Sequence, residues 1–260
     1  MASSRRFSPE RVIFMVAVLM VVSLNLHLSG FVQDMPQSFP LPDIPRGKPI
    51  TLKKPTPIFV VGLPKAGTSS IHAMFECSGI RSSHYCCCGS NRTHTHCNDG
   101  GKSFAQCMGH NIKNGRPILE NCGNYTVYAQ MDSELGNSIF LPQRFKLDLL
   151  HDYAPNATFI LNVRPAEEWV KSVSNWFGLG GRFLNLFKID PKKVARYEVL
   201  KEIFNNHTQF IRDFVQVHPS HSLVEVDISH SSAGTILADS FGLIESCWGR
   251  HNENKKRKST

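Results

Sequence analysis

The stretch that decides the fold is Pro57-Ile-Phe-Val-Val-Gly-Leu-Pro-Lys-Ala-Gly-Thr-Ser-Ser-Ile71. An apolar run breaks at a turn rich in glycine and proline, and the chain restarts with the hydroxyl residues that favour a first helical turn. Backbone N–H groups at a helix N-terminus lack intrahelical partners, and the helix dipole is positive there. Because Lys65 adds a point charge, we predict a strand that leads into an anion-binding loop.

The position of this lysine narrows the class of anion. A nucleoside-triphosphate P-loop has the form G-x-x-x-x-G-K-[ST], with the lysine directly after the second glycine. Here Thr68 follows Gly67, and Lys65 comes before that glycine. The segment Ser222–Ile228 contains an acidic strand end that could hold magnesium in a kinase, but this loop offers no triphosphate site for it to serve.

A second motif is Ala157-Thr-Phe-Ile-Leu-Asn-Val-Arg-Pro-Ala-Glu-Glu-Trp-Val-Lys-Ser-Val-Ser174. It predicts a buried strand that ends at Arg164 and a helix with Pro165 at its first position, where the missing N–H is no loss. Arginine presents a planar fork to phosphate oxygens, and Ser172 adds a hydroxyl two turns into the helix. Taken alone, an arginine followed by a helix that contains a serine is a common pattern, and the phosphate contact is what the resemblance described next implies.

Together, Pro64-Lys65-Ala66-Gly67-Thr68 and the Arg164–Ser172 pair resemble the donor-binding motifs of sulfotransferases, which use 3′-phosphoadenosine 5′-phosphosulfate and no metal. The resemblance covers roughly residues 57–243. It implies an α/β, P-loop-like three-layer fold with a central parallel sheet. It also implies that Lys65 neutralises the leaving oxygen and that Arg164 and Ser172 bind the 3′-phosphate. The residues that it places at the 5′-phosphate are Lys65, Ala66, Gly67, Thr68 and Ser69.

The implied reaction moves a sulfuryl group to a hydroxyl or amine of a carbohydrate or other secretory-pathway acceptor, such as a small hydroxylated molecule. A weaker resemblance continues through Ser222–Ile228 and the helical pattern Ala233–Leu243. The chain lacks the Arg-Lys-Gly-x-x-Gly segment that covers the adenine in cytosolic sulfotransferases, and this favours the Golgi or carbohydrate branch.

A general base is needed to accept the proton of the acceptor. Cytosolic sulfotransferases use a histidine and several Golgi members a carboxylate, each near the end of a strand. Asp132 and then Glu134 are the first two candidates, because both follow the strand predicted near 125–131. His84, in the loop after the first helix, is the third.

Two other functions remain open. The first is a P-loop kinase of a glycan or small molecule, which would need ATP and magnesium. The second is a secreted, non-catalytic glycoprotein that keeps the nucleotide-binding fold. Lys65 and Arg164 argue against the second function, because a scaffold needs neither.

The N-terminal segment predicts a membrane anchor. The stretch 12–32 is apolar and long enough to cross a bilayer core, and arginines precede it. A cleaved signal peptide is the alternative, which would give a secreted protein. The anchored form predicts a single-pass type II Golgi membrane protein with a luminal catalytic domain. The expected parts are a cytosolic N-terminus (1–11), the anchor (12–32), a proline-rich stem (33–56), the domain (57–250) and a basic tail (251–260).

Cysteines and sequons agree with the luminal side. Of the 8 cysteines, most lie between Cys77 and Cys122, which predicts a disulfide-stapled, cysteine-rich insertion over residues 81–109. A zinc site is the alternative, but the adjacent Cys86, Cys87 and Cys88 do not supply Cys-x-x-Cys spacing, so we expect disulfides and no metal. The Asn-x-Thr sequons lie at Asn91, Asn124, Asn156 and Asn206.

Strand and helix patterns alternate along the domain, which predicts a parallel sheet with helices on both faces. We expect strands over 57–63, 125–131, 157–164 and 222–227, and helices over 68–77, 103–113, 143–153, 165–177 and 232–241. A further long helix should begin with Asp190 as its cap. The net charge of +8 would suit a nucleic-acid ligand if the protein were nuclear. In the lumen the same charge favours an anionic nucleotide donor, so we expect no nucleic-acid partner.

Overall fold

The computed structural model describes residues 50–88 and 102–249. The predictions for the cytosolic N-terminus, the anchor, most of the stem, the basic tail and the sequon at Asn91 fall outside these residues. Across the two described ranges, no helix combines the length and the apolarity needed to span a bilayer.

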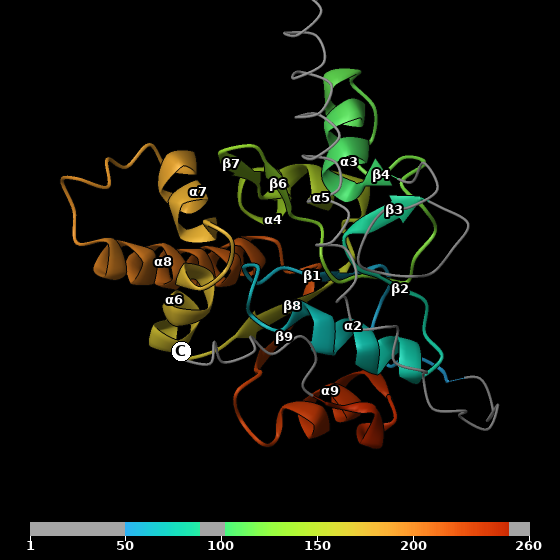
Figure 1. The fold of residues 1–260 in the computed structure, drawn as a ribbon. Helices are drawn as coiled ribbons and strands as arrows, with labels where there is room; N and C mark the ends of the chain where they lie inside the picture. The colour runs from blue at the N-terminus through green and yellow to red at the C-terminus, as the bar shows by residue number, and fades with distance from the viewer. Residues whose placement is uncertain (1–49, 89–101, 250–260) are drawn as a thin grey trace, which may run out of the picture. The chain divides into compact units, whose positions relative to one another are not determined.

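A five-stranded parallel sheet forms the centre of the domain (Figure 1). The sheet order is β2-β5-β1-β8-β9, so the direction of strand addition reverses at β1. In open α/β sheets, ligands bind beyond the carboxyl ends of the strands at such a reversal. The strands are β1 (Ile58–Val60), β2 (Ser82–Ser83), β5 (Val127–Tyr128), β8 (Thr158–Val163) and β9 (Ser222–Asp227).

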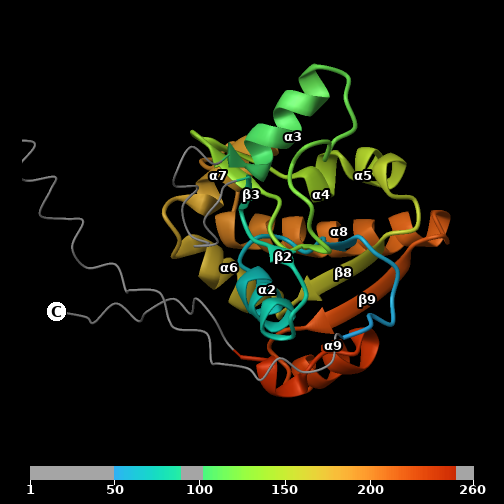
Figure 2. The ribbon, with the colours of Figure 1, turned by 90° about the vertical axis from the view of Figure 1, so that its right-hand side faces the viewer.

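Helices cover both faces of the sheet, which confirms the predicted three layers. Figure 2 shows α8 on one side of β8 and β9, and α2 and α9 on the other. Side chains alternate along the strands, so Phe59 and Phe159 pack in the core with α3, α5 and α8, whereas Ile58 and Val60 pack against α2 and α9. The helices are α2 (Thr68–Cys77), α3 (Phe104–Lys113), α5 (Leu147–Tyr153), α8 (Arg196–Val217) and α9 (Ala233–Phe241).

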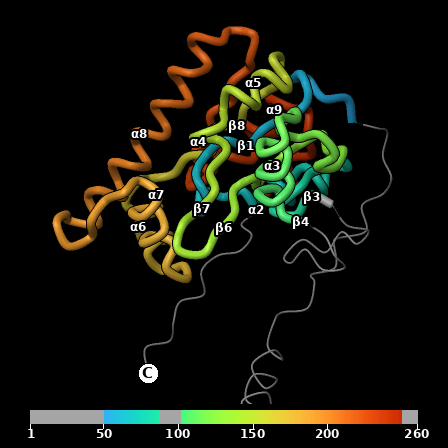
Figure 3. The backbone as a smooth tube through the Cα atoms, turned by 90° about the horizontal axis from the view of Figure 1, so that it is seen from above, coloured from blue at the N-terminus to red at the C-terminus, as the bar shows by residue number. Residues whose placement is uncertain are grey.

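A third apolar cluster lies around the fully buried Trp169. Figure 3 shows its helices α6 and α7 grouped beside the N-terminal end of α8. A two-stranded hairpin of β6 and β7 packs against α7 and leads into α4. These elements are β6 (Ser133–Leu135), β7 (Ser138–Phe140), α4 (Pro142–Phe145), α6 (Ala166–Ser174) and α7 (Leu179–Leu186).

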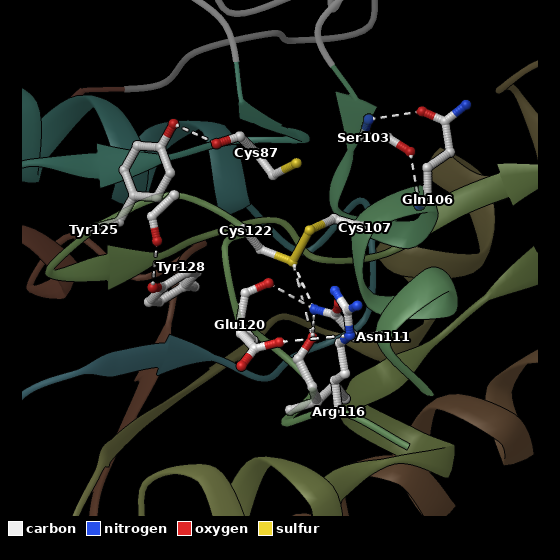
Figure 4. The surroundings of a disulfide bond; sticks show 12 residues. Cys87, Ser103, Gln106, Cys107, Asn111, Arg116, Glu120, Cys122, Tyr125 and Tyr128 are labelled. Carbon is white, nitrogen blue, oxygen red and sulfur yellow. Dashed lines mark hydrogen bonds and ion pairs between the residues drawn. A yellow bond between two sulfur atoms is a disulfide. The ribbon is translucent and has the colours of Figure 1, made fainter. Parts of the chain in front are cut away.

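A disulfide ties the described part of the cysteine-rich insertion to the rest of the domain, whereas residues 89–101 of the predicted insertion lie outside the described residues. Antiparallel strands β3 (Cys86–Cys88) and β4 (Lys102–Ser103) precede α3. At the N-terminus of α3, Ser103 and Gln106 form a capping box, and Cys107 is bonded to Cys122 (Figure 4). A second disulfide joins Cys77, at the end of α2, to Cys247 in the 3₁₀ helix η1 (Glu245–Cys247).

Several helix boundaries differ from the predictions, and α6 ends at Ser174 instead of residue 177. The helix expected over 143–153 is interrupted at Lys146 and forms α4 and α5. Pro165 is the residue before α6 rather than its first residue. The long helix begins at Arg196, because Asp190 closes a local turn instead of capping a helix: its Oδ1 accepts from Lys192 N at 3.0 Å. Residues 190–193 are mostly exposed, so no burial favours continuing that turn as a helix.

Candidate active site

The loop between β1 and α2 lies where the strand order reverses, and two glycines shape it. A Cβ at Gly62 would lie 2.3 Å from Asn162 O, so only glycine allows β1 and β8 to approach so closely here. Gly67 has φ 87°, in the left-handed region, and it directly precedes α2. The N-terminal end of α2 and the positive end of its dipole therefore face the loop, as predicted.

Two side chains, one from β8 and one from α6, fix the backbone of this loop. Asn162 accepts from Gly62 N at 3.0 Å and donates to Ala66 O at 2.7 Å. Trp169 Nε1 donates to Pro64 O at 2.9 Å from the centre of α6. Because Asn162 and Trp169 donate hydrogen bonds to the carbonyls of Ala66 and Pro64, the loop backbone is preorganised before any ligand binds. The N–H of Ala66 donates to Leu63 O at 3.2 Å, so this predicted phosphate donor is already engaged inside the turn.

Lys65 sits at the tip of the loop with φ 69°, a conformation that is uncommon for residues other than glycine. Its Nζ lies 3.6 Å from the centroid of the Trp176 ring. Burial, and then the nearby charge of Arg164, lower the pKa of Lys65 to about 8. The ammonium is therefore still mostly charged at pH 7, but it is poorly solvated and available to an anion.

Arg164 follows β8 and reaches back to the same loop. Its Nη1 donates to Lys65 O at 3.4 Å, and its Nη2 pairs with Glu168 at 2.7 Å. Within the described part of the chain its Nε is buried and has no hydrogen-bond partner. A buried donor without a partner is costly, so this atom marks a place that an anion would fill. Ser172 lies half-buried on α6, at the predicted spacing from Arg164.

Asp132 lies beyond the end of β5 and is 3% exposed. Gln130 Nε2 donates to its Oδ2 at 3.2 Å, and Gln143 Nε2 lies 3.4 Å from its Oδ1. The same Gln143 amide is 3.3 Å from Gly62 O, so one side chain joins the carboxylate to the loop. Burial raises the pKa of Asp132 to about 6, and the hydrogen bonds from Gln130 and Gln143 oppose this rise only in part.

The other two base candidates lie in different surroundings. His84 follows β2, and its Nε2 lies 3.1 Å from Ser69 Oγ and 3.4 Å from Thr68 Oγ1, in the first turn of α2. Glu134 is on β6, where it is exposed and pairs with Arg182 of α7 at 3.3 Å. His84 thus contacts the start of α2 directly, and Asp132 is connected to the loop through Gln143. Glu134 instead forms its ion pair with α7.

Several residues of this site escaped the sequence-based predictions. The sequence did contain a signal for Asn162, because a buried amide in the middle of an apolar strand must find hydrogen-bond partners. The sequence contains no such signal for Gln143, Trp169 and Trp176, because their roles depend on contacts between segments far apart in sequence. No cluster of three or more histidine, cysteine or acidic side chains suitable for a metal ion occurs within residues 50–88 and 102–249.

Comparison with known proteins agrees with this geometry. The family model described as "Sulfotransferase domain" matches residues 57–182, which include the loop, both predicted phosphate contacts and the three base candidates. No curated protein and no solved structure matches the chain significantly. Residues 57–182 therefore carry a sulfotransferase domain, which implies an enzyme that uses 3′-phosphoadenosine 5′-phosphosulfate.

Proposed function

We propose that this protein transfers the sulfuryl group of 3′-phosphoadenosine 5′-phosphosulfate to a hydroxyl or amine of a carbohydrate or other secretory-pathway acceptor. One observation carries the proposal. Arg164 reaches the glycine loop where the strand order reverses: its Nη1 donates to Lys65 O, and its buried Nε has no partner among the described residues. Two cationic groups at the N-terminal end of a helix suit a ligand with phosphates at both ends.

In this proposal each cation has a separate task. The bound donor supplies an activated sulfuryl group, and its transfer leaves negative charge on the oxygen that bridged it to the nucleotide. Lys65 stabilises that charge, and because its loop is held by Asn162 and Trp169, little reorganisation is needed. Arg164 and Ser172 bind the 3′-phosphate and so anchor the nucleotide at a distance from the reaction.

Arg164→Ala tests the nucleotide assignment. We expect it to weaken binding of the product, 3′-phosphoadenosine 5′-phosphate, by about tenfold to a hundredfold, because one charged hydrogen-bonded contact is lost. Binding of adenosine 5′-phosphosulfate, which lacks the 3′-phosphate, should hardly change. Isothermal titration of both nucleotides measures the difference between the two losses, which is a thermodynamic cycle on one contact.

Arg116→Ala is the matched control, since it removes an exposed arginine that pairs with Glu120 at 3.9 Å and lies outside the loop. It should leave both affinities unchanged. Equal weakening of both nucleotides by Arg164→Ala would make Arg164 a structural residue and remove the main support for the proposal.

A melting experiment separates the proposal from a P-loop kinase. A ligand that binds only the native state raises the melting temperature by mass action. We expect 3′-phosphoadenosine 5′-phosphate to raise it without magnesium, and ATP with magnesium to have little effect. The opposite pattern would favour the kinase, and no shift with either ligand would favour a non-catalytic glycoprotein.

We further propose Asp132 as the general base. A buried carboxylate with a pKa near 6 is ionised at pH 7 and is a stronger base than an ordinary aspartate. Its bridge through Gln143 to Gly62 keeps it beside the loop. The rate of transfer at saturating substrates should therefore fall about tenfold per pH unit below about pH 6, where Asp132 is protonated.

Asp132→Asn should lower activity and stabilise the fold at the same time. Because the pKa of Asp132 is higher in the folded protein than in the unfolded chain, its contribution to stability is full below about pH 4 and is lost as the pH rises through about 6. The variant should thus gain up to about 3 kcal/mol at pH 7.5 and nothing at pH 4. Urea unfolding at both pH values measures the gain.

Glu134→Gln is the control for Asp132→Asn, because it removes an exposed carboxylate two residues away and should change neither stability nor rate appreciably. An Asp132→Asn enzyme that keeps its full rate would exclude Asp132 as the base. Transfer lost in a Glu134→Gln or His84→Ala variant instead would assign the role to that residue.

For localisation, we propose a single-pass type II Golgi membrane protein with a luminal catalytic domain. The disulfides Cys77–Cys247 and Cys107–Cys122 support an oxidising compartment. The sequon residues Asn124, Asn156 and Asn206 are all exposed and can accept a glycan. In eukaryotic cells, glycosidase treatment should lower the apparent mass, and alkali extraction should leave the protein in membranes. Unchanged mass would contradict luminal placement, whereas release by alkali would favour the secreted form.

A further inference from the structure

Trp176 is an aromatic residue in direct contact with the cation of the proposed active site. Its ring centroid lies 3.6 Å from Lys65 Nζ. No described carboxylate forms an ion pair with Lys65, so the indole face is its main electrostatic partner in the described part of the protein. The nearby Arg164 is repulsive, since its charge lowers the pKa of Lys65.

The fold fixes the backbone that carries the indole ring. Trp176 follows the last turn of α6. Its backbone N–H donates to Val173 O at 3.2 Å, and its backbone carbonyl accepts from Leu179 N at 2.7 Å. Trp169, about two helical turns earlier, holds α6 to the loop through Pro64 O. The same segment therefore binds the loop backbone at Pro64 and the side chain of the next residue, Lys65.

An aromatic partner differs in kind from an acidic one. The face of an indole attracts an ammonium group through its quadrupole but carries no net charge. A carboxylate in this position would neutralise Lys65 and compete with an anionic ligand. An ammonium held against a ring keeps its charge and its outward N–H donors, so it remains able to bind an oxyanion.

We propose that Trp176 is a positioning residue that holds the charged side chain of Lys65 in place for sulfuryl transfer without neutralising it. This inference rests on the proposed function. It explains why a tryptophan that is 36% exposed lies at the loop instead of in the core. It also explains how a lysine stem with many rotamers is kept in one orientation beside a like charge.

The kinetic test compares Trp176→Leu with Trp176→Phe in the full-length protein. Trp176→Leu should lower kcat about two- to thirtyfold, the range expected for loss of one cation–π contact. The dissociation constant of 3′-phosphoadenosine 5′-phosphate should change less than about twofold, because positioning acts mainly on the developing charge. Trp176→Phe keeps an aromatic face and should recover most of the lost rate.

Phe177→Leu is the matched control, since it removes the neighbouring aromatic side chain, which is 80% exposed and meets Trp176 edge-on at 5.3 Å between ring centroids, whereas the ring over Lys65 Nζ is that of Trp176. It should leave kcat unchanged. The inference is overturned if Trp176→Leu keeps full activity, if Trp176→Phe is as slow as Trp176→Leu, or if nucleotide binding falls in step with kcat. The last result would make Trp176 a binding or structural residue.

A spectroscopic test does not depend on turnover. In protein labelled with ¹³C-lysine, the ε-methylene protons of Lys65, assigned with Lys65→Arg, should be shifted upfield by the ring current of Trp176. The shift should disappear in Trp176→Leu and persist in part in Trp176→Phe. Absence of the shift in the wild-type protein overturns the inference. A clear shift in a wild-type protein that neither binds the nucleotide nor transfers sulfate overturns the proposed function itself.

Discussion

Lys65→Ala is expected to lower kcat for sulfuryl transfer by about a hundredfold to a thousandfold, the range seen when one preorganised donor to a developing charge is removed. Its effect on binding of 3′-phosphoadenosine 5′-phosphate should be much smaller, less than about tenfold, because the charge it serves develops fully only in the transition state. Steady-state kinetics and titration of the product measure the two effects separately. The charge, rather than the side-chain stem, is the cause of the expected loss.

Lys65→Met separates the two contributions, because methionine keeps an apolar stem against Trp176 but carries no charge. It should be nearly as slow as Lys65→Ala while melting close to the wild-type protein. Recovery of the rate in Lys65→Met would show that the lysine acts through packing. Equal losses in kcat and in product affinity would instead make Lys65 an ordinary binding residue and leave the leaving oxygen without a partner.

The parts of this fold that follow from local pattern could be predicted from the sequence. Helix α2 runs from Thr68 to Cys77 and strand β9 includes Ser222 to Asp227, both as expected, because each has a clear apolar pattern and a boundary set by nearby residues. The parallel sheet followed from the alternation of strand and helix patterns. The prediction that Asp190 caps the long helix was wrong, because an aspartate can cap a helix or close a turn and the local sequence does not distinguish the two.

The candidate site was predictable only where one motif contains the chemistry. Lys65 and Arg164 could be singled out because each lies in a short motif after a buried strand and the two motifs together resemble those of sulfotransferases. The contacts that position them could not, since Gln143 and Trp169 reach the loop from segments about 80 and 105 residues away. Trp176 shows the same limit, because its partner lies beyond any helical or strand period. Such contacts depend on the strand order, which periodicity does not fix.

Removal of the Cys77–Cys247 disulfide should give the largest loss of stability. The bond closes a loop of 170 residues, and the chain-entropy relation assigns about 5 kcal/mol to a loop of that length. The Cys107–Cys122 bond closes only 15 residues and is expected to contribute about 3 kcal/mol. A Cys77→Ser/Cys247→Ser double variant, compared with Cys107→Ser/Cys122→Ser by urea unfolding under oxidising conditions, measures both values.

Which of the two double variants loses more unfolding free energy tests how the disulfides stabilise the protein. If unfolded-state entropy dominates, the long loop must lose more, even though Cys77 and Cys247 lie in a region with other support: Ile244 N donates to Ser78 Oγ at 3.1 Å, and Trp248 packs on Gly234. If the short-loop variant loses as much or more, native packing around Cys107 and Cys122 governs stability instead. Beside that disulfide, Asn111 donates to Glu120 O at 2.7 Å (Figure 4).

The Cys77–Cys247 bond also bears on function, because it fastens the C-terminal end of α2, the helix that begins at the Lys65 loop. Since Asn162 and Trp169 hold that loop at the other end of the helix, the double variant should lose stability while keeping its kcat in the fraction that remains folded.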